Sequence, residues 1–186
     1  MDHYLDFTVL PDPEFRETTL LGALVSKLHR RLVTLEADDI GISLPDFEKA
    51  PPLGNRLRVH GTQERIETLM QEEWLGGMRG QLEIAPRRAV PAEVLHRGVR
   101  RRQYKTNVER LRRRRMRRHG ETHEEARERI PDTVARKVKT PFLTVYSSSS
   151  GQRFSLFIEH EPVQARPVVG AFNSYGISRE ATIPWF

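Results

Sequence analysis

The chain contains 186 residues, no cysteine, 37% hydrophobic residues and a formal net charge of +6. The lack of cysteine excludes a disulfide framework, a thiolate nucleophile and a cysteine-based zinc or iron–sulfur site. No apolar run approaches the roughly 20 residues that a membrane-spanning helix needs, and the first residues do not resemble a signal peptide. The seven histidines form no HExxH-like motif. We therefore expect a cytoplasmic protein that uses no metal or other cofactor.

The first half of the chain has the apolar periodicity of alternating strands and helices. Leu21, Leu24 and Leu28 recur at three- and four-residue spacing, which is typical of a helix with one buried face. The expected strands are 4–10, 40–44, 56–60 and 81–85, and the expected helices are 16–37 and one that Thr62 caps. This β–α–β–β–α–β order predicts an α+β fold whose residues 1–90 form a ferredoxin-like domain.

A basic segment follows an expected linker at residues 86–91. Between Arg97 and Arg118 there are twelve Lys and Arg residues and one acid, Glu109, so this segment carries +11 and the rest of the chain −5. Thr106 and Glu109 have the spacing of a capping box, which predicts a helix over about 107–119 that Gly120 ends. Because like charges repel along such a helix, we expect it to need a bound polyanion.

The remaining residues predict a short helix, a hairpin and a docked end. Thr122 and Glu125 form a second capping box, for a helix that ends near Ile130. Residues 142–146 and 153–158 alternate as two strands of a hairpin, and Trp185 with Phe186 is expected to be a docked anchor, either on the core or on a partner. Residues 91–186 are thus predicted to form a smaller α/β region that binds RNA.

The residues themselves leave three functions open. The first is a sequence-specific endoribonuclease, and the second is a non-catalytic RNA-binding or assembly protein that uses the same basic helix. The third, a DNA-binding basic-region protein, is disfavoured because no heptad dimerisation segment follows the arginines. His29 lies at the edge of the apolar stripe of its helix, a position that by itself is more typical of an ordinary boundary histidine.

Several short motifs together resemble one family over nearly the full length of the chain. They are MDHYLD at the start, KLH in the first helix, ERLRRRxMRRH in the basic helix, RIPDTVAR, SSSGQRFSLFI, SYGIS and the final PWF. This pattern is similar to the CRISPR-associated endoribonuclease of type I-F systems, which cuts the repeat hairpins of a precursor transcript. The resemblance implies a metal-independent enzyme that binds one stem-loop and cuts at the 3′ base of its stem.

The resemblance also implies which residues act. His29 would move the proton of the RNA 2′-OH, Ser147 would hold the ribose, and Tyr175 would orient His29. The expected products are a 2′,3′-cyclic phosphate and a 5′-hydroxyl. The implied RNA-binding residues are Arg101 and Gln103 at the foot of the stem, Arg102 between them in the sequence, Phe154 under a terminal base, and Arg113, Arg114, Arg117, Arg118 and His119 in the groove.

Two points concern assembly and the basic helix. The resemblance implies a protein that is a monomer on its own and has other subunits of the type I-F surveillance complex as partners. Arg115 stands where the family pattern has an apolar residue, so the sequence leaves open which face of the helix packs on the rest of the chain.

Overall fold

The structure is a computed structural model that describes residues 1–49, 53–104, 108–132, 140–146 and 151–186. The chain forms two compact units, which are Met1–Arg101 with Pro141–Phe186 (unit 1) and Arg102–Thr140 (unit 2). The expected boundary between two domains at residues 90 and 91 stays a prediction. The two units are compact groups of contacts, and a compact group of contacts need not be a domain that folds on its own. Among the described residues, no helix has the length and apolar composition to cross a membrane.

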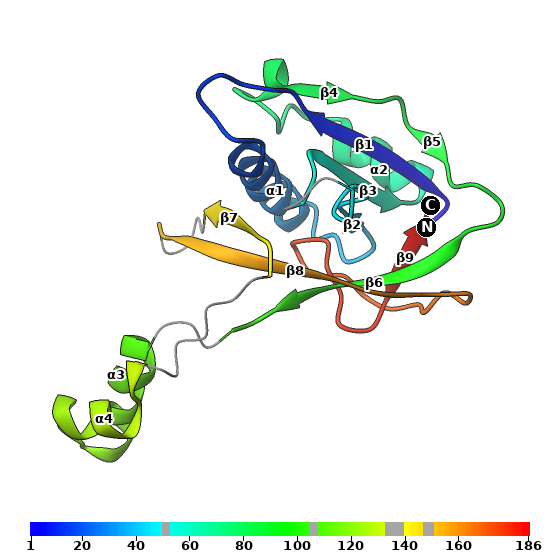
Figure 1. The fold of residues 1–186 in the computed structure, drawn as a ribbon. Coiled ribbons are helices and arrows are strands. Elements are labelled where there is room, and N and C mark those ends of the chain that lie inside the picture. The colour runs from blue at the N-terminus through cyan, green and yellow to red at the C-terminus, as the bar shows by residue number, and fades with distance from the viewer. Residues whose placement is uncertain (50–52, 105–107, 133–139, 147–150) are drawn as a thin grey trace. The chain divides into compact units, whose positions relative to one another are not determined.

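The first sheet of unit 1 carries the element order that the sequence predicts (Figure 1). Its antiparallel strands run in the order β2-β3-β1-β4, and β5 pairs with an end of β1. The strands are β1 His3–Val9, β2 Gly41–Ser43, β3 Arg56–Gly61, β4 Leu82–Ile84 and β5 Arg88–Ala89. Helices α1 (Glu17–Thr34) and α2 (Gln63–Met70) follow β1 and β3, a 3-10 turn at Arg79–Gln81 precedes β4, and Thr62 caps α2 as expected.

The expected linker after β4 is partly wrong. Arg88 and Ala89 pair with Tyr4 and His3 as β5, so β1 has a partner beyond the end of β4. The next residues form a further strand, β6 (Leu95–Arg102), where no element was predicted. The sequence of β6 lacks the alternation of apolar and polar residues that predicts a strand, because four of its residues are arginines and only Gly98 and Val99 are buried.

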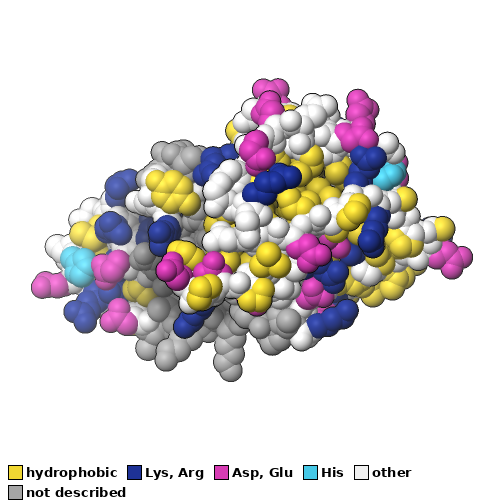
Figure 2. Space-filling view, turned by 90° about the horizontal axis from the view of Figure 1, so that it is seen from above, with side chains coloured by type: hydrophobic (Ala, Val, Ile, Leu, Met, Phe, Trp, Pro, Cys, Tyr) yellow, Lys and Arg dark blue, Asp and Glu magenta, His cyan; other side chains and the backbone are white. Residues whose placement is uncertain are grey.

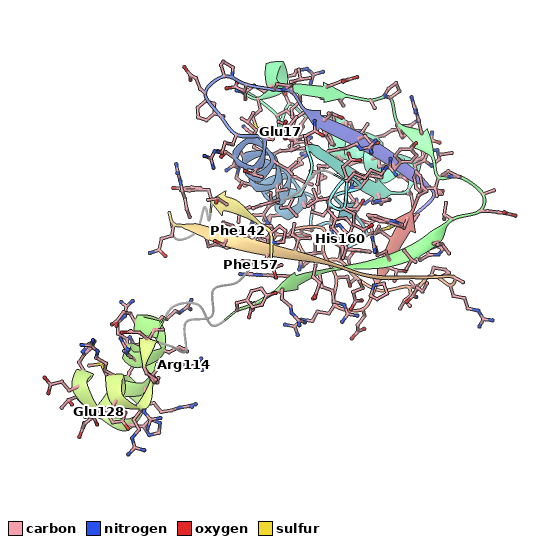
Figure 3. All side chains as sticks on the ribbon, in the orientation of Figure 1. Glu17, Arg114, Glu128, Phe142, Phe157 and His160 are labelled. Atoms are coloured by element: carbon pink, nitrogen blue, oxygen red, sulfur yellow. The ribbon has the colours of Figure 1, made fainter. Side chains whose placement is uncertain are left out.

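The second sheet of unit 1 contains the predicted hairpin. Its strands are β6, β7 (Phe142–Tyr146), β8 (Arg153–Gln164) and β9 (Thr182–Trp185), in the order β7-β8-β6-β9. Leu143 and Val145 face the core, whereas Phe142 is 44% exposed and contacts Phe157 across the hairpin (Figure 3). This alternation is what a strand buried on one face requires.

The C-terminal residues dock on unit 1, as the sequence predicts. Trp185 packs against the core and contacts His160 and Phe47. The guanidinium of Arg58 lies over the ring of Phe186 at 4.2 Å and that of Tyr4 at 4.4 Å. These contacts join the two ends of the chain within one unit.

In the part of unit 2 that the structure describes, helix α3 (Val108–His119) packs on helix α4 (His123–Arg129). Helix α3 ends at Gly120, whose φ of +67° is the left-handed conformation that favours glycine. The capping box of Thr122 and Glu125 starts α4 as predicted. Thr106, the expected cap of the basic helix, lies outside the described residues.

Candidate functional site

His29 lies on α1, half-buried, with its ring held from two sides. Its Nδ1 atom is 2.9 Å from the carbonyl oxygen of Ser174. Because a carbonyl oxygen only accepts hydrogen bonds, Nδ1 must carry the proton. The neutral ring therefore has its lone pair on Nε2, and this atom is the one that can take a proton from a substrate.

Tyr175 covers one face of the His29 ring. The two rings are stacked with centroids 3.9 Å apart and planes 3° apart. Burial raises the pKa of the Tyr175 phenol, and the positive charge of Arg101 opposes this shift only in part. The phenol is therefore neutral at physiological pH, so Tyr175 can orient His29 by stacking but does not supply a base.

A tight turn fixes Tyr175 beside the helix. The Tyr175 N–H donates to the side-chain oxygen of Asn173, and the Ile42 N–H of β2 donates to the Gly176 carbonyl, both at 2.8 Å. Gly176 has a φ of +68°, and a Cβ there would collide with Ile42. The glycine is thus required both for the turn and for its close approach to the first sheet.

Two of the residues predicted to bind RNA, Phe154 and Arg101, continue the row of contacts that begins with His29 and Tyr175. Phe154, on β8, meets Tyr175 edge to face with centroids 6.2 Å apart. The Arg101 guanidinium, at the end of β6, lies over the Phe154 ring at 5.3 Å. Residues from four separate segments therefore line up as His29, Tyr175, Phe154 and Arg101, all within unit 1.

Ser147, the expected ribose-holding residue, lies outside the described residues. Strand β7 ends at Tyr146, immediately before it in the sequence. Arg102 and Gln103 belong to unit 2, where both side chains are exposed.

The arginines of α3 divide into an inward and an outward set. Arg112 is only 3% exposed and donates to the Ile130 carbonyl and to the Asp132 carboxylate. Arg115 donates two hydrogen bonds to Glu121. These carboxylates offset part of the repulsion along the helix, and the expected need for a bound polyanion stays a prediction for the arginines that they do not engage.

The outward set contains the arginines predicted to contact RNA. Arg113, Arg114, Arg117, Arg118 and His119 are all exposed on α3, and Arg114 is labelled in Figure 3. Arg115 belongs to the inward set, which settles which face of α3 packs within unit 2. The sequence does not reveal this division, because Glu121 and Asp132 meet the arginines only after α3 and α4 fold together.

The charge of the chain is concentrated in unit 2. Its residues 102–140 include fourteen Lys and Arg and six Asp and Glu, a net +8, which leaves −2 for unit 1. On the face shown in Figure 2, basic and acidic side chains are interspersed over the surface. Within the described ranges, no three His, Asp or Glu side chains gather as possible metal ligands.

Comparisons with known proteins place the chain among CRISPR-associated proteins. Residues 4–186 match a family model described as CRISPR-associated protein (Cas_Csy4). The chain is 47% identical over 187 residues to the CRISPR-associated endonuclease Cas6/Csy4 of Pseudomonas aeruginosa (strain UCBPP-PA14) and 43% identical over 186 residues to that of Escherichia coli (strain UTI89 / UPEC), with full coverage of all chains. A solved structure of the CRISPR endoribonuclease Cse3 bound to a 19-nucleotide RNA covers 99% of this chain and 100% of its own, at 14% identity and a TM-score of 0.38.

Proposed function

Because the chain belongs to the CRISPR-associated Csy4 family, we propose that it is an endoribonuclease that processes precursor CRISPR RNA. It binds the stem-loop of the repeat and cuts at the 3′ base of the stem without a metal ion. One observation carries the chemical part of this proposal. The His29 ring is fixed by Ser174 and Tyr175 in the tautomer that leaves Nε2 as a proton acceptor.

The reaction uses a nucleophile that the substrate itself supplies. The 2′-OH next to the scissile phosphate attacks the phosphorus in line, and the 5′-oxygen of the next nucleotide leaves. His29 Nε2 takes the 2′ proton as the new O–P bond forms, and the departing 5′-oxygen takes up a proton as it leaves. The proposed products are a 2′,3′-cyclic phosphate and a 5′-hydroxyl.

The ribose at the cut must be held so that its 2′-OH is aligned for attack. We assign this task to Ser147, the residue that follows the last residue of β7. A covalent serine mechanism is unnecessary, because the RNA already carries its nucleophile. Tyr175 acts as a positioning residue, since its neutral phenol ring sets the plane of His29.

Recognition is divided between the two units. Near the cut, Phe154 offers an aromatic face for a terminal base, Arg101 and Gln103 read the two base pairs at the foot of the stem, and Arg102 also binds RNA. A bidentate arginine–guanine or glutamine–adenine contact discriminates by roughly 1–3 kcal/mol. In unit 2 the outward residues of α3 bind phosphates along the stem. Arg112 and Arg115 do not, because carboxylates of unit 2 already engage them.

Two broader features complete the proposal. The order β2-β3-β1-β4 of the first sheet, with α1 and α2 in the crossovers, supports a ferredoxin-like assignment for residues 1–90. We also propose that the enzyme is monomeric on its own and remains in the type I-F surveillance complex beside the other subunits after it cuts.

A cleavage assay in the presence of EDTA tests the proposed function. The chain is incubated with a repeat hairpin, and the ends of the products are analysed for a cyclic phosphate. We expect cleavage at one site at the 3′ base of the stem, with an undiminished rate in EDTA. RNA that stays bound but intact would overturn the nuclease proposal and leave the alternative, a non-catalytic RNA-binding or assembly protein.

A further inference from the structure

Ser26 is a buried polar residue of α1 that makes two hydrogen bonds. Its side chain is 5% exposed. The Oγ atom donates to the Gly22 carbonyl at 2.8 Å, one turn earlier in the helix, and accepts the backbone N–H of Tyr146 at 3.0 Å. The second bond joins α1 to the end of β7, which lies 120 residues further along the chain.

Ser26 and Gly22 together hold α1 on the outer edge of β7. Among the described residues this strand pairs with β8 alone, so its other edge would otherwise present unpaired backbone groups. A Cβ at Gly22 would collide with the Thr144 carbonyl oxygen, so helix and strand are in direct contact there. One turn later along α1, Ser26 accepts the hydrogen bond of the Tyr146 N–H. His29 follows Ser26 by three residues and so lies near it on the helix surface.

These contacts close a ring of described residues around the candidate site. From Tyr146 the chain of contacts passes to Val145, whose partner across the hairpin is Phe154. Phe154 meets the edge of Tyr175, and Tyr175 stacks on His29. His29 is three residues from Ser26 on the same rigid helix. The Ser26–Tyr146 bond therefore fixes the hairpin and its aromatic residue relative to the histidine.

We propose that Ser26 is a positioning residue for RNA cleavage. The inference rests on the proposed function, because its consequence is a change in the cleavage rate. Ser26 does not touch the RNA. It holds the β7–β8 hairpin at one distance from His29, so that a base on Phe154 and a ribose near the end of β7 arrive in line with the Nε2 atom.

Removal of the hydroxyl is expected to loosen this arrangement without disturbing the binding of the stem. In Ser26→Ala the Tyr146 N–H, which is partly buried, loses its acceptor, and a shift of the hairpin would let this N–H bond to water instead. Because in-line attack tolerates little displacement, and an error of about 1 Å can cost about 100-fold in rate, we expect cleavage at saturating RNA to slow at least about tenfold. The groove-binding residues of α3 belong to unit 2, so the Kd for RNA should change less than about threefold.

A matched control separates positioning from stability. Ser43 is another buried serine of unit 1, 1% exposed, whose Oγ is 2.9 Å from His60 Nε2 in the first sheet. Ser43→Ala removes one buried hydrogen bond, whereas Ser26→Ala removes two hydrogen bonds, and the Ser43 bond lies outside the ring of contacts. Both variants should lower Tm, whereas only Ser26→Ala should slow the cleavage step. Equal single-turnover rates for the two variants would overturn the proposal.

A second pair of variants breaks the same bond from the strand if Ser26→Ala fails to fold. Tyr146→Pro removes the N–H donor of this bond. That N–H points away from β8, so its loss leaves the hydrogen bonds between β7 and β8 in place. Tyr146→Val changes the side chain but keeps the N–H. We expect Tyr146→Pro to cut slowly and Tyr146→Val to cut at a rate close to that of the wild type. Equal rates for this pair would also contradict the proposal.

NMR of the His29 imidazole gives a readout that needs no cleavage. The stacked Tyr175 ring shifts the His29 carbon-bound protons, so a displaced hairpin should change these signals in Ser26→Ala and leave them unchanged in Ser43→Ala. If the wild type does not cut RNA, the proposed function fails, and the effect of Ser26 on the cleavage rate is overturned with it. Unchanged His29 signals would overturn the positional claim as well.

Discussion

Tyr175 lies face to face with His29, with ring planes only 3° apart, although 145 residues separate the two in the sequence. The stack and the Ser174 carbonyl hold the imidazole in one orientation and one tautomer. An imidazole held in this way loses no rotational freedom when the transition state forms, which is one advantage that a preorganised base provides. The proposed mechanism depends on this pair of residues more than on any other.

Replacement of His29 by alanine should stop cleavage and leave binding intact. The substitution removes the Nε2 acceptor, and general base catalysis typically contributes 100- to 10,000-fold. We expect a loss of at least about 100-fold in the single-turnover rate, with a Kd for the hairpin within about threefold of that of the wild type. Gel-shift and cleavage assays on one preparation measure both quantities, and a normal rate would show that another group is the base.

Tyr175 should tolerate phenylalanine but not alanine. Phenylalanine keeps the ring that stacks on His29, and the raised pKa of the phenol argues against a role for an ionised hydroxyl. Tyr175→Phe should therefore cut at close to the normal rate, whereas Tyr175→Ala should be about tenfold slower or worse. A large defect in the phenylalanine variant would instead indicate that the hydroxyl group takes part.

The two sets of arginines on α3 should respond differently to substitution. Arg114→Ala or Arg118→Ala removes an exposed charge and should weaken RNA binding. Each lost phosphate contact should reduce the slope of log Kd against log salt by about 0.9. The measurement is a salt titration of hairpin affinity by filter binding, and an unchanged slope would exclude a phosphate contact.

Arg112→Ala is the structural counterpart of these variants. It removes a buried guanidinium that bonds the Ile130 carbonyl and the Asp132 carboxylate, and so it should lower the thermal stability of the α3–α4 pair. Hydrogen exchange of the α4 amides in the RNA-free protein measures this effect. Unchanged exchange would show that Arg112 is dispensable for the fold of unit 2.

Stability should fall as the solution becomes acidic, because two histidines of unit 1, the buried His60 and the partly buried His160, must stay neutral. Burial lowers the pKa of both His60 and His160 to about 3. In the unfolded chain both titrate near 6.5, so between about pH 6.5 and pH 3 the unfolded state binds more protons than the folded state. Stability is fully present above this window, and each histidine removes about 1.4 kcal/mol per pH unit as the pH falls through it.

Urea unfolding at pH 7 and at pH 5 measures this dependence. The drop in unfolding free energy should be smaller in His60→Gln than in the wild type, because one of the two titrating groups is gone. An equal drop in both proteins would show that His60 does not contribute to it.

The sequence predicts local structure better than the contacts between distant segments. The apolar stripe of α1, the Thr62 cap and the alternation in β7 are recorded in consecutive residues, and the structure contains all three. Strand β6 escaped prediction because its arginines hide a strand whose central Val99 alone carries an apolar side chain into the core. Apolar periodicity predicts a strand from its buried face, and it gives no signal where most residues of the strand itself are polar.

The candidate site shows the same division. Family resemblance indicated His29 and Tyr175 separately, but no local pattern predicts that their rings are stacked. The inward turn of Arg112 and Arg115 depends on acids that approach only when α3 and α4 pack together. Ser26 gave no signal at all, because a serine in a helix has the same sequence appearance whether or not it binds a distant strand.

The most direct test of the proposed mechanism is a repeat hairpin with a single 2′-deoxynucleotide on the 5′ side of the scissile phosphate. This change removes the nucleophile and leaves every other contact in place. We predict that the RNA binds with an unchanged Kd and is not cut, even after incubation long enough to cleave the unmodified hairpin completely. Cleavage of the deoxy substrate at the same position would contradict attack by the 2′-OH, and with it the role assigned to His29.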